Sequence, residues 1–268
     1  MFRTAFAFLK KDFLVESSYR LSFLFNIFTV LVSVLSYFFI DRLFGQTIVS
    51  HLEEFGVNYF SYVLLAMAFF SYIGIGAGSF SSQIHNEQVQ GTLEAILLSP
   101  AKIYTILFSM GLWNLINAAI EMALYIILGI YLFHIDFSKI NILSSGIIMF
   151  LSISSFNALG IISASFTLLF KRGNPFNWIV GTMEGLISGV YFPITILPDW
   201  LQFLAQFFPI TYAIRAIELA VYRNYTIMQL QREITFLALF SLILAPLSLR
   251  IFSLSLKKAR KYATLGQY

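Results

Sequence analysis

The chain has 268 residues, of which 59% are hydrophobic and only 11% are charged. A soluble domain carries about 25% charged residues, so this composition excludes a globular protein with a fully water-facing surface. The mean hydropathy of +0.81 and the long apolar runs place the chain in the membrane class. The net charge of +4 comes from residues near the ends of apolar segments, which favours a membrane protein over one that binds nucleic acid.

Apolar runs long enough to cross a bilayer occur six times along the chain. A bilayer core of about 30 Å takes roughly 20 residues of helix. We therefore expect an all-α membrane protein in which residues 1–268 form a single transmembrane domain. The six expected spans are 21–40, 59–82, 104–133, 142–170, 175–192 and 234–253.

Two further stretches have the wrong pattern for a span. Residues 1–20 mix Phe and Leu with Lys and Arg, which predicts an amphipathic helix lying in the membrane interface. Residues 193–213 contain three prolines, which predicts a re-entrant helical hairpin before the sixth span. Broken backbone of this kind is tolerated at membrane depth only where protein buries it or where it lines a cavity.

The distribution of Lys and Arg predicts the orientation. With the N-terminus inside, twelve of the 17 basic residues fall in cytoplasmic segments and five fall outside. Positive charge accumulates on the cytoplasmic side of membrane proteins. We therefore expect a multi-pass protein of the cell membrane, plasma or inner, with both termini in the cytoplasm.

The segment 84–100, between the second and third expected spans, is polar at its start and amphipathic in its middle. Its apolar and polar side chains fall on roughly opposite faces at helical spacing. These are Leu93, Ile96 and Leu97 on one face, and Glu87, Gln90 and Glu94 on the other. Two interpretations remain open, a solvated cytoplasmic loop or a docking helix presented to a cytoplasmic partner.

Three glycines recur every four residues in the fifth expected span. Gly181, Gly185 and Gly189 would therefore form a stripe of small residues along one helix face, where another helix can approach closely. The stripe is explained either by packing within one subunit or by a dimer interface or transport pathway.

Two carboxyl groups lie within expected spans, Glu121 in the third and Glu184 in the fifth. A charge in the bilayer costs several kcal/mol unless it is paired, protonated or hydrated. Each is either a structural carboxyl with a hydrogen-bond partner or a functional group, and Glu184 beside the glycine stripe would then face the pathway.

Two motifs resemble one family, the membrane subunit (permease) of type-2 ATP-binding-cassette transporters. The first has the pattern E-x-x-x-G-T-L-E-x-x-L-x-S-P and consists of Glu87, Gly91, Thr92, Leu93, Glu94, Leu97, Ser99 and Pro100. The second comprises residues 189–193, 197–202 and 208–212 and includes Phe192, Pro193, Pro198, Trp200, Pro209 and Tyr212. The first is similar to the family's cytoplasmic coupling segment and the second to its outer re-entrant hairpin. The resemblance covers nearly the whole chain.

The resemblance implies an exporter in which two permeases form the pathway and two copies of a separate ATPase subunit bind below. Residues 84–100 would sit in a groove of the ATPase, which would bind ATP and Mg, while this chain would carry no cofactor. A second copy of this chain is the expected dimer partner, because closed homodimers are common. The abundance of Phe favours a hydrophobic or amphipathic substrate such as a drug, lipid or glycolipid. A polysaccharide or glycoconjugate exporter is the alternative.

The residues themselves argue against catalysis by this chain. A phosphate-binding P-loop needs a Gly-Lys dipeptide, and the sequence contains none. No metal site is expected either, because His51, His85 and His134 lack metal-binding spacing. An alternative from another class is a proton-coupled secondary transporter that uses Glu121 and Glu184 as proton relays.

Overall fold

The computed structural model describes residues 2–18, 20–98, 103–169, 181–182 and 185–261. This part of the chain is helical and contains no β-strand. Its elements, with two short 3-10 helices labelled η, are α1 Phe2–Ser18, α2 Arg20–Ile48, η1 Val49–His51, α3 Tyr59–Val89, α4 Leu93–Leu98, α5 Ile103–Tyr131, α6 Ile142–Leu169, η2 Ile194–Ile196, α8 Asp199–Ala205, α9 Pro209–Tyr222 and α10 Gln231–Lys261.

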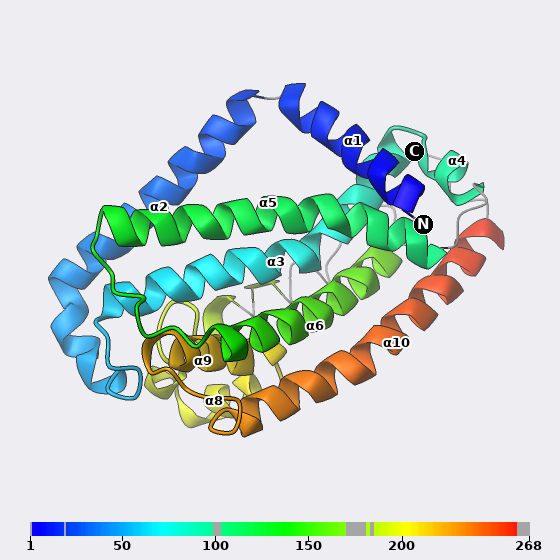
Figure 1. Cartoon of the computed structure of the whole chain (residues 1–268). Coiled ribbons are helices and arrows are strands. Elements are labelled where there is room, and N and C mark those ends of the chain that lie inside the picture. Colours follow the sequence, from blue (N-terminus) through cyan, green and yellow to red (C-terminus); the bar gives the residue numbers. More distant parts are fainter. Residues whose placement is uncertain (1, 19, 99–102, 170–180, 183–184, 262–268) are drawn as a thin grey trace.

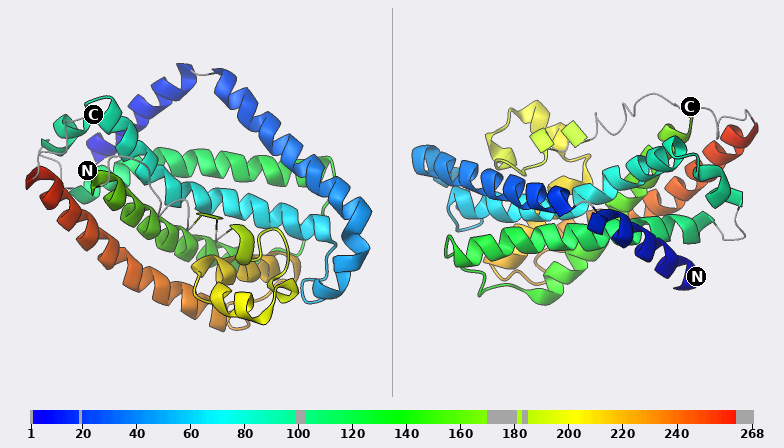
Figure 2. Two further views of the ribbon diagram at one scale, coloured as in Figure 1. Left: turned by 180° about the vertical axis from the view of Figure 1, so that it is seen from behind. Right: turned by 90° about the horizontal axis from the view of Figure 1, so that it is seen from above.

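The long helices α3, α5, α6 and α10 lie side by side and form the body of the molecule (Figure 1). Helix α3 packs against both α5 and α6, and α6 packs against α10. Helix α1 packs on α5, whereas α2 runs obliquely and joins α3 mainly through its C-terminal half (Figures 1 and 2). The first half of α2 exposes large apolar side chains such as Phe25 and Phe28, each 62% accessible.

Apart from the junction of α1 and α2, the connections between the described helices gather at two opposite ends of this bundle. Helix α4, the start of α1 and the end of α10 lie at one end, which we call the elbow end (Figure 1). The connections from α2 to α3 and from α5 to α6 lie at the other, together with α8 and α9, and we call this the hairpin end. Helix α3 has 31 residues and is therefore about 46 Å long, enough to join the two ends.

Local sequence signals explain where several helices begin. The side-chain oxygen of Asn58 accepts a hydrogen bond from the backbone N–H of Ser61 and caps α3. Asn141 caps α6 in the same way through the N–H of Ser144, at 3.0 Å. Pro209 stands in the first turn of α9, where its missing N–H costs no helical hydrogen bond.

Two clusters of buried apolar side chains hold the bundle together. The larger lies toward the hairpin end and includes Phe69, Phe156 and Ile214. Helix α9 contributes heavily to it, because every residue of α9 except Arg215 is buried. The smaller cluster lies toward the elbow end and includes Leu93 of α4, packed among side chains of α3, α5, α6 and α10.

Four of the described helices are long and apolar enough to cross a membrane. They are Leu24–Gly45, Thr105–Tyr131, Ile142–Leu169 and Gln231–Ala259, and they correspond to the first, third, fourth and sixth expected spans. The pair α8 and α9, bent by 90°, would be a fifth if it counts as one span. Helix α3 contributes the shorter apolar stretch Tyr59–Gly74.

The six-span count itself stays a prediction. Residues 175–180, 183 and 184 of the expected fifth span lie outside the described residues, and its described part leaves the helix at Ser188, short of the expected end at Phe192. The expected second span ends at residue 82, whereas α3 continues to Val89. Two polar residues of this last part, Gln83 and Glu87, hydrogen-bond to side chains of α1.

The predicted break between residues 193 and 213 is present as η2, α8 and the sharp turn into α9. The expected end of this region at residue 213 was too early, since α9 continues to Tyr222. Residues 2–18 form the expected N-terminal helix. Its position in the membrane interface and that of the hairpin relative to the membrane stay predictions.

Candidate functional site

The segment between α3 and α5 forms a sharp elbow. Gly91 has a φ of +70°, a left-handed conformation that side chains with a Cβ rarely adopt. A Cβ at this position would meet no atom within 4 Å, so the backbone turn alone explains the glycine. The N–H of Thr92 then donates to the carbonyl of Glu87 at 3.0 Å, and α4 begins at Leu93.

Helix α4 has one buried anchor and an exposed surface. Leu93 is 1% accessible and packs among apolar side chains that include Phe80 of α3 and Phe252 of α10. Glu94 is exposed, and Leu98 is 75% accessible. Ile96, partly buried, packs against the same cluster, so the anchored helix presents an acidic and an apolar group to whatever lies beyond the elbow end. The side chain of Leu97 and all of Ser99 and Pro100 lie outside the described residues.

Glu87 lies inside this elbow, although the helical spacing grouped it with Gln90 and Glu94 on the face opposite the apolar residues. The residue is only 3% accessible, and its carboxylate accepts hydrogen bonds from the Lys11 ammonium and the Thr92 hydroxyl. A buried carboxylate needs such partners, because an unpaired one is costly. Glu87 thus joins α1, the end of α3 and the start of α4, a role that the local pattern did not reveal.

Helix α1 is attached to the bundle near the elbow by two further contacts. Asp12 accepts a hydrogen bond from Gln83 of α3 at 3.4 Å. Phe13 meets Trp113 of α5 edge to face, with ring centroids 5.8 Å apart. A displacement of α4 would therefore reach α1 and α3 together.

The expected glycine stripe is interrupted. Gly181 is exposed and helical, and Gly185 is buried and helical. Gly189 lies beyond the helix end with a φ of +90°, so it does not continue the helical face. Its carbonyl instead accepts a buried hydrogen bond from the Tyr62 hydroxyl of α3. Glu184 lies outside the described residues.

The prolines of the second motif shape the hairpin. Pro193 precedes η2, Pro198 precedes α8 and Pro209 opens α9. Phe192 is partly buried, whereas Trp200 on α8 is 64% accessible.

Tyr212 joins the hairpin to the last helix. Its ring stacks on Phe236 of α10, with centroids 4.6 Å apart and an interplanar angle of 20°. Tyr212 and the three prolines therefore position α8 and α9 across the end of the bundle.

Two carboxyl groups inside the bundle behave differently. Glu121 is partly buried and accepts a hydrogen bond from Ser71 of α3 at 2.8 Å. Glu218 of α9, which we did not single out, is fully buried and neither of its oxygens has a hydrogen-bond partner in the described part of the protein. Apolar residues at helical spacing, Ile210, Ile214 and Ile217, continue past residue 213, the expected end of the re-entrant region. This spacing predicts a longer helix that includes Glu218.

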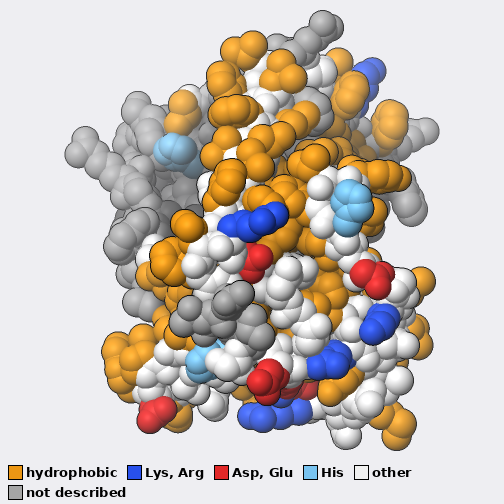
Figure 3. All heavy atoms as spheres, turned by 90° about the vertical axis from the view of Figure 1, so that its left-hand side faces the viewer, with side chains coloured by type: hydrophobic (Ala, Val, Ile, Leu, Met, Phe, Trp, Pro, Cys, Tyr) orange, Lys and Arg blue, Asp and Glu red, His pale blue; other side chains and the backbone are white. Residues whose placement is uncertain are grey.

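Arginines at the hairpin end tie the α2–α3 connection to α9. Arg215 donates to Glu54 at 2.6 Å and to Glu233 of α10 at 2.8 Å. Arg223 donates to the backbone carbonyls of Glu53 and Glu54. Figure 3, which views this end of the molecule, shows charged side chains of both signs gathered in its lower part. Among the residues described, no three His, Cys, Asp or Glu side chains are placed to hold a metal ion.

The long apolar helices and the bent pair of α8 and α9 are those of a helical membrane protein. A family model for the ABC-2 type transporter matches residues 4–222. The chain belongs to this family, whose members are the membrane domains, or permease components, of ATP-binding-cassette transporters and work with a separate ATPase subunit. The resemblance drawn from the two motifs is thus confirmed. None of the curated proteins compared with the chain matches it.

Proposed function

We propose that the chain is the membrane-spanning subunit of an ATP-driven exporter and that the elbow is its contact with the ATPase. The observation that carries the proposal is the two-sided elbow, in which α4 is anchored by buried Leu93 while Glu94 and Leu98 stay exposed. A partner that pushes on α4 would transmit the movement to α3 through the Gly91 turn and to α1 through Glu87. Two ATPase copies, each with ATP and Mg, would serve a homodimer of this chain.

The orientation of this assembly places both termini and the elbow in the cytoplasm. The start of α1, the elbow and the end of α10 lie at one end of the bundle, as this topology requires (Figure 1). The exposed apolar faces of α2 and α10 would meet lipid or the second copy. A helix of the second copy could also approach closely at Gly181, because a Cβ at this position would meet nothing within 4 Å.

A hydrophobic or amphipathic substrate, such as a drug, lipid or glycolipid, suits a chain with 30 Phe residues. A polysaccharide or glycoconjugate remains the alternative substrate class. Proton-coupled secondary transport is less favoured, because the family works with an ATPase and Glu121 is already hydrogen-bonded to Ser71.

The proposal is tested by purifying the chain with its candidate ATPase and measuring complex formation and ATP-dependent transport. Glu94→Lys should weaken both, because it reverses the charge on the exposed face of α4 without disturbing the buried anchor. Glu53→Lys makes the same change on an exposed residue at the hairpin end and should leave both intact. If Glu94→Lys and Leu98→Asp each retain full complex formation and transport, the elbow is not the contact.

A further inference from the structure

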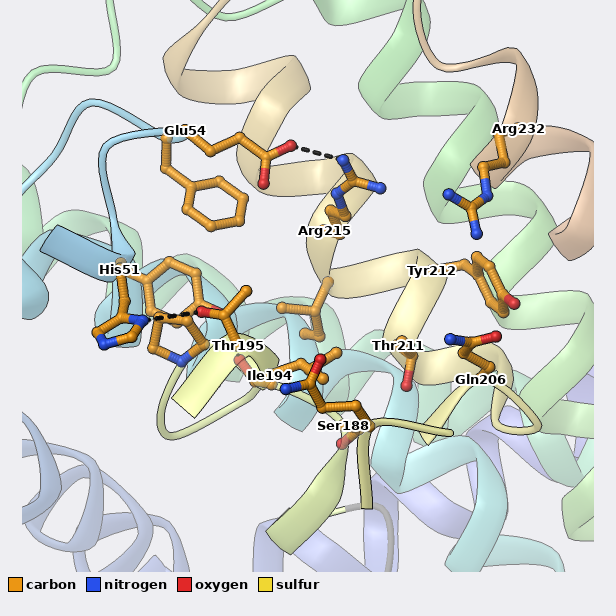
Figure 4. Close-up of a pocket in the computed structure, with 16 residues that line it drawn as sticks. His51, Glu54, Ser188, Ile194, Thr195, Gln206, Thr211, Tyr212, Arg215 and Arg232 are labelled. Carbon is orange, nitrogen blue, oxygen red and sulfur yellow. Dashed lines mark hydrogen bonds and ion pairs between the residues drawn. The ribbon is translucent and has the colours of Figure 1, made fainter. Parts of the chain in front are cut away.

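A cavity of about 260 Å³ opens at the hairpin end. It lies between the α2–α3 connection, the bend at Ser188 and Gly189, the corner from α8 to α9, and the start of α10 (Figure 4). Ligand pockets of drug size measure roughly 300–1,000 Å³. This cavity is smaller and suits a headgroup or a small polar molecule rather than an entire lipid.

Two arginines line the cavity, and only one of them forms ion pairs with carboxylates of the described residues. Arg215 already binds the carboxylates of Glu54 and Glu233. Arg232 makes no ion pair with any of the described residues, and its guanidinium extends toward Tyr212 over the cavity in Figure 4. Of the two arginines that line the cavity, Arg232 is therefore the one that no described carboxylate neutralises.

Residues from the first turns of two helices line the same space. Thr211 and Tyr212, from the first turn of α9, line the cavity, and so does Arg232 from the start of α10. The N-terminal end of a helix carries a partial positive charge of about half a unit. Glu233 offsets this charge at α10, but it is 4% accessible and bound to Arg215, so it does not face a ligand as a free anion.

We propose that this cavity binds a phosphate-type anion, with Arg232 as its principal charged contact. Arg favours phosphate because its planar donors match two oxygens at once. The anion is either the headgroup of a membrane lipid or a free phosphate ester. Neither source requires export, so this site stands or falls independently of the coupling elbow.

The test measures ³¹P line broadening with the full chain in dodecyl maltoside, a detergent without phosphorus. The probes are a short-chain phosphatidic acid and glycerol 3-phosphate, and the short-chain diacylglycerol without phosphate competes as a control. Binding of phosphatidic acid alone identifies a lipid headgroup as the ligand, and comparable binding of glycerol 3-phosphate identifies a free phosphate ester. If neither probe binds, or if diacylglycerol displaces phosphatidic acid equally well, phosphate recognition is refuted.

Variants separate the cavity from unspecific attraction to a basic protein. Arg232→Gln should weaken binding at least about tenfold, the usual effect of losing a charge-assisted hydrogen bond. Gln206→Glu adds a negative charge to the cavity lining and should also abolish most binding. Arg232 and Gln206 are both exposed, so neither change disturbs the core. Lys139→Gln removes an exposed cation outside the lining and should have no effect. Equal affinities for Arg232→Gln and Lys139→Gln would overturn the proposal.

Discussion

The ion pair between Lys11 and Glu87 allows a prediction in which the two partners are not equivalent. The Lys11 side chain is 42% accessible, whereas that of Glu87 is 4% accessible. Removing the lysine leaves a buried carboxylate whose one remaining side-chain partner among the described residues is the Thr92 hydroxyl. Replacing the glutamate by glutamine leaves an ammonium that water can hydrate, and the amide oxygen can still accept from Thr92. Lys11→Ala should therefore be the more damaging change.

The expected magnitudes follow from this asymmetry. Breaking a fully buried pair costs about 3–5 kcal/mol, but the half-exposed lysine reduces that value. We expect about 2 kcal/mol for Lys11→Ala and about 1 kcal/mol for Glu87→Gln, in the range of hydrogen bonds to charged groups. The double variant should cost less than the sum of the two, with a coupling energy of about 1 kcal/mol.

The assay is equilibrium unfolding of the purified protein in mixed micelles, with Lys10→Ala as the control for an exposed neighbouring lysine. The same variants are then measured for ATP-dependent transport with the partner ATPase. If the costs of Lys11→Ala and Glu87→Gln are strictly additive, the two side chains do not interact and the attachment of α1 to the elbow is refuted.

Two further predictions concern the interior. Gly189→Ala should destabilise the protein by about 1–2 kcal/mol, because φ is +90° and a Cβ would lie 3.2 Å from Ile194, whereas Gly181→Ala should change unfolding by less than about 0.5 kcal/mol. Equal unfolding energies for the two alanine variants would contradict the bend. Glu218→Met should be at least as stable as the parent protein, because it removes a buried carboxyl group whose oxygens have no hydrogen-bond partner in the described part of the protein. A loss of more than about 2 kcal/mol in equilibrium unfolding would show that the carboxylate has a partner.

The helices could be predicted from the sequence because their signals are local. Apolar runs of about 20 residues located α2, α5, α6 and α10 to within a few positions at most ends. The prolines at 193, 198 and 209 located the hairpin. Where a boundary was wrong, a distant neighbour explains it: α9 continues to Tyr222 because its apolar side chains are covered by α3, α6 and α10.

The structural expectations at the candidate sites that depended on a local pattern were correct, whereas those that depended on a distant contact were not. The pattern around Gly91 indicated a turn and a short amphipathic helix, and the structure has both. The helical spacing also placed Glu87 opposite the apolar residues and Gly189 on a glycine stripe, but Glu87 is buried in the elbow and Gly189 lies beyond the helix end. Each depends on a contact that a local pattern does not contain, Lys11 for the first and Tyr62 for the second.

The sequence by itself determined the membrane class, the family and the position of the elbow, because composition, apolar length and a glycine turn act over a few consecutive residues. Only the tertiary structure decided which polar groups are buried and with whom. Lys11 and Glu87 are 76 positions apart, and Glu54 and Arg215 are 161 apart. Such pairs form only when the bundle brings separate helices together, and that packing also created the cavity lined by Arg232 and Ser188.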